Sequence, residues 1–285
     1  PVVITTWQSI YKLPKKYFDS YTAVIGDECH TFKAKSLTSI MTKLHEAKYR
    51  IGFTGTLDGT KTHRLVLEGL FGLSDRVTST ADLMKRDQLT QLKIKILALK
   101  HESYKFANYQ DEMEYIVTHG KRNTFIKNLV SDLKGNTLVL FNYVEKHGEP
   151  LFDLINKSIG DTKKVFFVHG GVEASEREEI RRLAEVNDNC VIIASYGTFS
   201  TGINIKNLHN IIFASPSKSR IRNLQSIGRV LRKGDNKAQA VLYDIADDFS
   251  RGSYINYTLN HLKERIKVYN EEQFNYEIIP VNIKK

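Results

Sequence analysis

Short apolar runs along the chain alternate with longer stretches in which apolar residues recur every three or four positions. The runs have the length of buried strands, and the longer stretches have the spacing of amphipathic helices. Strands that alternate with helices are typical of parallel sheets covered by helices. The pattern therefore predicts an α/β fold in which parallel sheets carry helices on both faces.

The first third of the chain is predicted to contain strands at residues 2–5, 23–27 and 49–54, and helices at residues 36–46 and 63–70. A polar, charge-rich stretch at residues 74–91 then interrupts the alternation. We expect a domain junction there, so that residues 1–90 form part of one domain and residues 91–285 form a second.

The second domain is predicted to begin with a strand at residues 94–99 and a helical region at residues 109–133. Its main sheet is expected to have about five strands, at residues 137–141, 164–168, 190–194, 211–214 and 240–243. An amphipathic helix at residues 254–270 and an extended segment at residues 276–283 complete the predicted pattern.

The composition, with 41% hydrophobic and 26% charged residues among 285, is typical of a soluble globular protein of about two domains. It excludes a disordered or collagen-like chain, and no apolar run approaches the roughly 18 residues that a membrane span needs. The two cysteines, Cys29 and Cys190, provide no disulfide framework and no zinc-ligand spacing. This cysteine usage favours a reducing compartment such as the cytoplasm.

The charge balance is strongly basic, because 42 lysines and arginines against 32 acids give a formal net charge of +10. An excess of this size favours a polyanionic partner, and nucleic acid is the first candidate. From the charge alone, ordinary solvated surface is an equal alternative.

Two adjacent carboxylates, Asp27 and Glu28, follow an apolar strand, and His30 comes two residues after them. Ligands bind at the carboxyl ends of parallel strands. There, one acid can hold Mg²⁺ through a water molecule while its neighbour orients the water that attacks a γ-phosphate. A solvated turn or a helix N-terminus would also favour acids at these positions.

Two further segments have patterns that suit phosphate chemistry. Thr54 and Thr56 flank a glycine at the end of the next strand, where hydroxyls can relay contacts between a nucleotide and a second domain, although a simple turn is the alternative. Gln225, Arg229 and Arg232 have the spacing of one helical face. Two guanidinium groups there suit the charge of a phosphoryl-transfer transition state, while a salt-bridged surface helix is the alternative.

Taken in order, these segments resemble the motifs of superfamily 2 helicases over nearly the whole chain. The sequence DECH at residues 27–30 resembles motif II, and residues 54–56 resemble motif III. The other matching segments are residues 4–9 (the Ib region), 137–143 and 168–171 (motif IV and its companion), 191–204 (motif V) and 225–232 (motif VI). The order and spacing are more specific than any single motif.

The resemblance implies two RecA-like domains that bind ATP and Mg²⁺ between them. Asp27 would coordinate Mg²⁺ through water, Glu28 would activate the attacking water, and His30 would couple the nucleotide site to the second domain. The other residues implied at the nucleotide are Thr54 and Thr56 for coupling, Arg229 and Arg232 for contact with ATP, and Gln225, Gly202 and Asn204 in support.

The resemblance also implies a nucleic-acid track and a class of substrate. The residues expected along the track are Thr6, Trp7, Phe141, His169, Gly170, Ser195 and Thr201, with core packing as the alternative for Phe141. The chain is most similar to phage members of the family, which implies DNA or RNA partners in branched forms such as R-loops, forks and recombination intermediates. No membrane is implied, and the oligomeric state stays open.

Three departures from the family pattern stand out. Gly55 replaces the usual alanine of motif III, and Asn204 stands where motif V often has an acid. No Gly-x-x-x-x-Gly-Lys-Ser/Thr phosphate loop occurs in the sequence, and only 26 residues precede Asp27. We therefore expect that the front of the first motor domain is missing and that this chain alone does not turn over ATP.

Two other functions fit parts of the pattern. A nucleic-acid binding or annealing module could keep the helicase fold without a working motor. Asp27, Glu28 and His30 could instead form a metal-dependent nuclease site, but no further acid or histidine has evident ligand spacing, and the residue 225–232 segment would be unexplained.

Overall fold

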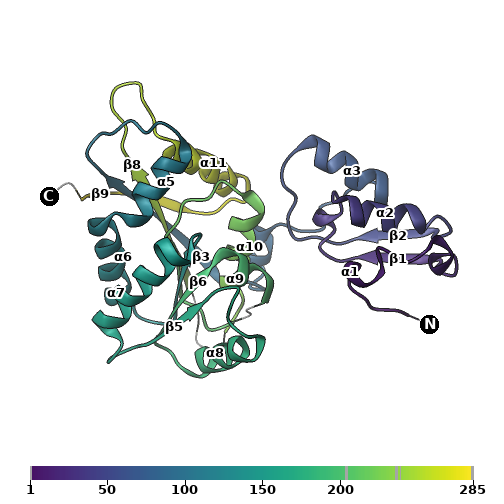
Figure 1. Cartoon of the computed structure of the whole chain (residues 1–285), viewed down its shortest axis with the longest axis horizontal. Helices are drawn as coiled ribbons and strands as arrows, with labels where there is room; N and C mark the ends of the chain where they lie inside the picture. The colour runs from purple at the N-terminus through teal and green to yellow at the C-terminus, as the bar shows by residue number, and fades with distance from the viewer. Residues whose placement is uncertain (1, 203–204, 235–236, 238, 284–285) are drawn as a thin grey trace. The chain divides into compact units, whose positions relative to one another are not determined.

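The computed structural model describes residues 2–202, 205–234, 237 and 239–283, without the side chains of residues 200–202 (Figure 1). The chain divides into two compact units, Pro1–Val77 and Thr78–Lys285. The division lies within the polar stretch expected as the junction, but before the predicted boundary at residue 90. The reason is that α4 (Thr80–Lys85) buries Ala81 and Met84, and Met84 belongs to a hydrophobic core of the second unit.

The first unit is built around two parallel strands, β1 (Ala23–Gly26) and β2 (Tyr49–Gly52). Its helical segments are α1 (Trp7–Ile10), η1 (Lys15–Phe18), η2 (Cys29–Thr31), α2 (Lys35–Lys43) and α3 (Lys61–Phe71). Leu37, Ile40, Met41 and Leu44 share one face of α2 and its end, and this face packs into the core of the unit.

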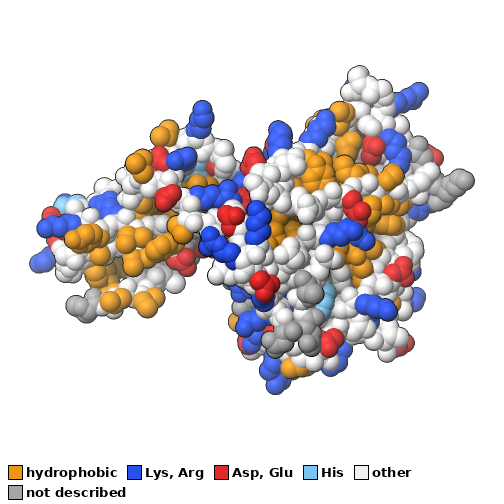
Figure 2. All heavy atoms as spheres, turned by 180° about the vertical axis from the view of Figure 1, so that it is seen from behind, with side chains coloured by type: hydrophobic (Ala, Val, Ile, Leu, Met, Phe, Trp, Pro, Cys, Tyr) orange, Lys and Arg blue, Asp and Glu red, His pale blue; other side chains and the backbone are white. Residues whose placement is uncertain are grey.

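The strand predicted at residues 2–5 does not form. Val2 and Ile4 are 91% and 96% exposed and belong to no strand. An apolar run becomes a strand only when a neighbouring strand accepts its hydrogen bonds, and β1 and β2 pair only with each other among the described residues. One face of this small sheet is also exposed, since Ile25, Ile51 and Phe53 are accessible to solvent. Hydrophobic side chains are visible on the surface of this unit in Figure 2.

The second unit is a seven-stranded sheet of order β5-β6-β4-β7-β8-β3-β9, in which all of the neighbouring pairs are parallel. Its strands are β3 (Gln91–Lys100), β4 (Thr137–Phe141), β5 (Lys164–Val168), β6 (Cys190–Ser195), β7 (Asn210–Phe213), β8 (Gln239–Asp248) and β9 (Tyr276–Asn282). The sheet is thus larger than the five strands expected, because β3 and β9 join its edge beside β8.

Helices cover both faces of this sheet, as the apolar pattern predicts (Figure 1). The alternation along β4 shows why: Leu138 and Leu140 pack into one core, and Val139 and Phe141 pack into the other. The helices of the second unit after α4 are α5 (Tyr109–Thr118), α6 (Gly120–Asp132), the π-helix η3 (Val144–Gly148), α7 (Glu149–Ile159), α8 (Ala174–Val186), α9 (Tyr196–Gly202), α10 (Arg220–Val230) and α11 (Tyr257–Glu271). In the described part of the chain, no helix has both the length and the apolar character of a membrane span.

Candidate functional site: a helicase motif cluster

The acidic pair lies in a strained turn directly after β1. Glu28 has φ 46° and ψ 47°, a left-handed conformation that few residues other than glycine adopt. Asp27 stabilises the turn, because its Oδ1 accepts a hydrogen bond from the backbone N–H of Glu28 at 2.9 Å. Strain of this kind gathers at functional sites, where the surrounding structure must hold it in place.

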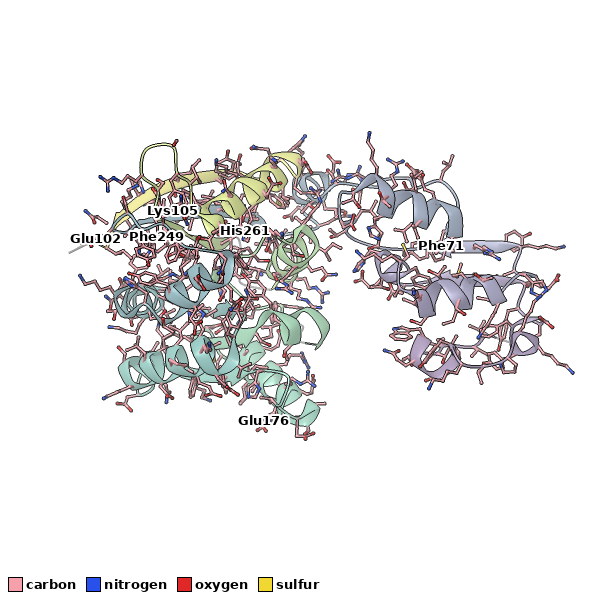
Figure 3. All side chains as sticks on the ribbon, turned by 45° about the horizontal axis from the view of Figure 1, so that its top comes forward. Phe71, Glu102, Lys105, Glu176, Phe249 and His261 are labelled. Atoms are coloured by element: carbon pink, nitrogen blue, oxygen red, sulfur yellow. The ribbon has the colours of Figure 1, made fainter. Side chains whose placement is uncertain are left out.

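The backbone around this turn is fixed by β2 and α3. Phe53 N–H donates to the Gly26 carbonyl at 2.8 Å, and Cys29 N–H donates to the Phe53 carbonyl at 2.9 Å, so the ladder continues past the strand ends. Phe71, on the last turn of α3 (Figure 3), packs so closely that a Cβ at Gly26 would lie 2.9 Å from its ring. Glycine is therefore needed at the end of β1.

The turn brings together the predicted residues of motifs II and III. His30 Nδ1 lies 3.1 Å from Glu28 Oε2 and 2.9 Å from Thr54 Oγ1. The Thr54 hydroxyl is in turn 3.1 Å from the Thr56 carbonyl. His30 is buried, whereas the Glu28 carboxylate is exposed. Glu28 can thus meet a ligand while the buried His30 and the half-buried Thr54 fix its position.

The Asp27 side chain fits a magnesium ion that keeps most of its water. Its carboxylate is exposed, and Oδ2 takes no hydrogen bond from the described residues. Mg²⁺ is commonly bound by one or two carboxylates together with water and substrate phosphates. Among the described residues, no group of three or more His, Cys, Asp or Glu side chains is placed so that it could hold a metal ion.

The predicted motif VI residues lie on and just after α10. Gln225 and Arg229 are one turn apart on the helix and half-buried, but α10 ends at Val230, so Arg232 is not on the same helical face. Groups from outside the helix bind the carbonyls at and just after its end. Lys237 Nζ donates to the Val230 carbonyl and, at 2.8 Å, to the Arg232 carbonyl, and Thr90 N–H donates to the Leu231 carbonyl at 2.8 Å.

The Arg229 side chain is directed by an aromatic ring. Its guanidinium carbon lies 5.6 Å from the centre of the Phe199 ring, which is fully buried in α9. Such a cation–π contact orients a guanidinium without neutralising it. Arg232 is exposed.

Three predicted nucleic-acid residues lie at one edge of the large sheet. His169 and Gly170 follow β5 and Ser195 ends β6, and these two strands are parallel neighbours. Ser195 Oγ lies 2.9 Å from Thr198 Oγ1, and His169 Nδ1 accepts a hydrogen bond from the Gly171 N–H at 3.2 Å. These contacts fix polar groups at the carboxyl edge of the sheet, which is the edge where ligands bind.

The remaining track residues have different outcomes. Phe141 is fully buried and stacks on Phe167, with ring centres 5.6 Å apart. It is therefore a core residue whose ring is not accessible for stacking with nucleic-acid bases. Thr6 precedes α1, and Trp7, its first residue, is 39% exposed. The side chain of Thr201 and the whole of Asn204 lie outside the described residues, and Gly202 is the last residue of α9.

Sequence reasoning missed Arg222, which connects three segments near the same edge. Its Nη1 donates to Asn142 Oδ1 at 3.1 Å, and its guanidinium carbon lies 5.6 Å from the centre of the Tyr196 ring. Asn142 directly follows β4. Arg222 shares the helical face of Gln225 and Arg229, and this spacing was the signal that could have revealed it.

Comparisons with known proteins find similar sequences among helicases. The model of the helicase conserved C-terminal domain matches residues 120–234, and the model of the type III restriction enzyme res subunit matches residues 1–59. The ATP-dependent DNA helicase uvsW of Enterobacteria phage T4 is 36% identical over 301 residues, covering 99% of this chain and 59% of the relative. A putative ATP-dependent RNA helicase, L396 of Acanthamoeba polyphaga mimivirus, is 22% identical and covers 98% and 57%.

Solved structures show the same fold. The crystal structure of T4 UvsW matches with a TM-score of 0.60 at 35% identity, covering 99% of this chain and 58% of that one. A putative HsdR subunit of a type I restriction enzyme from Vibrio vulnificus has a TM-score of 0.72 at 16% identity, covering 97% and 52%, and this match concerns the fold alone. The chain spans less than three fifths of the two curated relatives' length. Over nearly all of its own length it is similar to ATP-dependent helicases, and residues 120–234 match the helicase conserved C-terminal domain.

Proposed function

We propose that this chain is the motor-core part of an ATP-dependent helicase or translocase that remodels branched nucleic acids such as R-loops, forks and recombination intermediates. Residues 1–90 would supply motifs Ib to III at the end of one RecA-like domain, and residues 91–285 would form the second. The observation that carries the proposal is the cluster in which His30 and Thr54 hold the exposed Glu28 in a left-handed turn.

In this proposal, each residue of the cluster has a distinct task. Bound ATP would supply the phosphoryl group, and Mg²⁺ would neutralise part of its negative charge. Asp27 would hold the ion through water, and Glu28 would orient the attacking water and accept its proton. Arg229 and Arg232 stabilise the charge that develops on the phosphoryl group, with Gln225 in support. Thr56 belongs to the loop that relays the state of the nucleotide.

Nucleic acid would bind mainly through its backbone. The net charge of +10 and the polar groups of His169, Gly170 and Ser195 at one sheet edge support such binding, and Thr6 and Trp7 would extend it. Binding through phosphates depends strongly on salt and little on sequence. The similarity to a DNA helicase supports DNA as a substrate, and the branched forms are the more specific part of the proposal.

We also propose that the complete motor includes a phosphate loop outside this sequence. The sequence has no such loop. In addition, Ile25, Ile51 and Phe53 leave one face of β1 and β2 exposed, whereas a parallel sheet is normally covered on both faces. The same missing loop favours a second candidate for these 285 residues by themselves, a nucleic-acid binding module that does not turn over ATP.

The test is ATP hydrolysis by the longer natural protein, with and without forked DNA or an R-loop. A Glu28→Gln variant should abolish DNA-stimulated turnover, because an amide cannot accept the proton. Glu46→Gln is a matched control, since Glu46 is an exposed acid of the same unit that contacts only His45 among the ion pairs described. Turnover absent from both the natural protein and the variant, with DNA binding retained, would favour the binding module.

A further inference from the structure

We propose that His63 and Asp58 form a positioning pair that ties the motif III loop to the motif II turn and so sets the rate of ATP turnover. The inference rests on the proposed function. Neither residue belongs to a helicase motif in the sequence, and both lie in the stretch between Thr56 and the middle of α3. The pair deepens the site by adding a second layer behind Glu28 and His30.

His63 holds the backbone of motif II. Its ring is 96% buried, and Nε2 lies 2.8 Å from the carbonyl oxygen of His30. A carbonyl only accepts hydrogen bonds, so the Nε2 atom must carry the proton and donate it. The His30 carbonyl belongs to the same residue whose side chain contacts Glu28 and Thr54. A displaced carbonyl would therefore displace the group that orients Glu28.

Asp58 lies in ion-pair contact with the other side of the His63 ring, without an aligned hydrogen bond to Nδ1. Its Oδ2 lies 2.9 Å from His63 Nδ1 and 3.3 Å from Lys33 Nζ. Its Oδ1 accepts from the Thr60 N–H at 2.9 Å and from the Thr60 hydroxyl at 2.8 Å. Partial burial raises the pKa of Asp58, but the hydrogen bonds from Thr60 and the neighbouring His63 and Lys33 outweigh burial and lower it to about 2. The carboxylate is thus a fixed negative charge.

The two ends of α3 contact the turn at different points. At the N-terminal end, Thr60 caps the helix by accepting from His63 N–H, which places the imidazole beside His30. At the C-terminal end, Phe71 packs over Gly26 and Gly52. In the sequence, the strained Glu28 lies between Gly26, which Phe71 contacts, and His30, whose carbonyl His63 binds. Because Asp58 is four residues after Thr54, the pair also fixes the loop that carries motif III.

The position of His63 distinguishes a positioning role from a catalytic one. The ring is buried and both of its nitrogens face protein groups, so it has no atom to offer to a nucleotide. Loss of the pair should therefore slow the chemical step without weakening binding of the nucleotide. The expected signature is a lower kcat with an unchanged KM for ATP.

The first experiment compares three variants of the longer natural protein. His63→Leu should lower kcat at least tenfold and keep the KM for ATP within twofold. His63→Gln, whose amide can still donate to the His30 carbonyl, should restore kcat to within threefold of the unchanged protein. His45→Leu is the matched control, because His45 also pairs with a carboxylate, Glu46, but lies on the surface of the same unit. An unchanged kcat in His63→Leu, or an equal loss in His63→Gln, would overturn the proposal.

A second measurement on the 285-residue chain separates this proposal from the proposed function. Hydrogen exchange of the Cys29, Thr31 and Phe32 amides, which are bonded across the turn, should be at least tenfold faster in His63→Leu and unchanged in His45→Leu. If the natural protein does not hydrolyse ATP, the proposed function fails, and the exchange rates still decide whether the pair holds the turn. Equal exchange in both variants would refute the pair.

Discussion

At the residue scale, His147 makes the stability of the second unit depend on pH. The side chain is fully buried in η3, and Nδ1 contacts Ser215 Oγ at 3.0 Å. Burial, with a smaller effect of the Arg122 charge, lowers the pKa of His147 to about 3. The unfolded chain binds this proton near pH 6.5, so stability is full above that pH and falls as the pH drops toward about 3, by up to about 1.4 kcal/mol per pH unit.

Urea unfolding at pH 7, 6 and 5 checks this expectation. In His147→Gln, the free energy of unfolding should fall less steeply with decreasing pH than in the unchanged chain. All other titratable residues are the same in both proteins, so the difference between the two slopes isolates His147. Parallel slopes would show that the folded protein tolerates a proton on this ring.

The residues of the site differ in how far a sequence can reveal them. Glu28, His30 and Thr54 could be predicted because their types and spacing match a known pattern, and the structure brings the three together. His63 could not, because its contact with the His30 carbonyl depends on the fold bringing together groups 33 residues apart. Phe141 shows the opposite limit: its type suits base stacking, but its position on a central strand buries it.

At the scale of elements, a single buried carboxylate organises the start of α11. Glu112, from α5, accepts hydrogen bonds from the backbone N–H groups of Tyr257 and Thr258, both at 2.8 Å, and from the Asn256 side chain at 2.6 Å. A negative charge at a helix N-terminus is favourable, and these donors would be left unpaired without it. Glu112→Ala should therefore lower the free energy of unfolding by about 3 kcal/mol, as measured in urea.

Glu114→Ala is the control for this prediction. Glu114 lies two residues along the same helix and pairs with Lys146 at the surface. Exposed ion pairs contribute little, so its removal should leave the unfolding curve in place. Equal effects of the two substitutions would mean that Glu112 affects stability through its helix propensity in α5 and not through its hydrogen bonds at the start of α11.

The bounds of two strands could be predicted from their apolar runs. Strand β4, which pairs with β6 and β7, has the predicted bounds, and so does β5, which lies at the edge of the sheet beside β6. The apolar residues Val2 and Ile4 look similar in sequence but lie exposed, since a strand also needs a partner that local sequence does not supply. The pairing of β3 with β8 and β9 likewise depends on segments that are distant in sequence.

At the scale of the whole molecule, the second unit should fold by itself, and its stability should reveal where it begins. Its two hydrophobic cores consist only of its own residues, so Thr78–Lys285 should unfold cooperatively without the first unit. A chain of residues 91–285 would lose the burial of Met84 and the hydrogen bond from Thr90 to the Leu231 carbonyl. These losses should cost about 3 kcal/mol of unfolding free energy.

The same pair of chains also tests how the end of α10 is held. Thr90 lies just before the predicted start of the second domain at residue 91, but it donates hydrogen bonds to the Leu231 and Arg232 carbonyls. Its removal should therefore speed hydrogen exchange after Val230 as well as lower the stability. Exchange within α7, on the opposite face of the sheet, should stay unchanged apart from the global loss and so provides the internal control. If residues 91–285 were as stable as 78–285, the second unit would begin at the boundary that the polar pattern predicts. In that case α4 would not contribute to the stability of the unit. The buried Met84 leads us to expect the opposite.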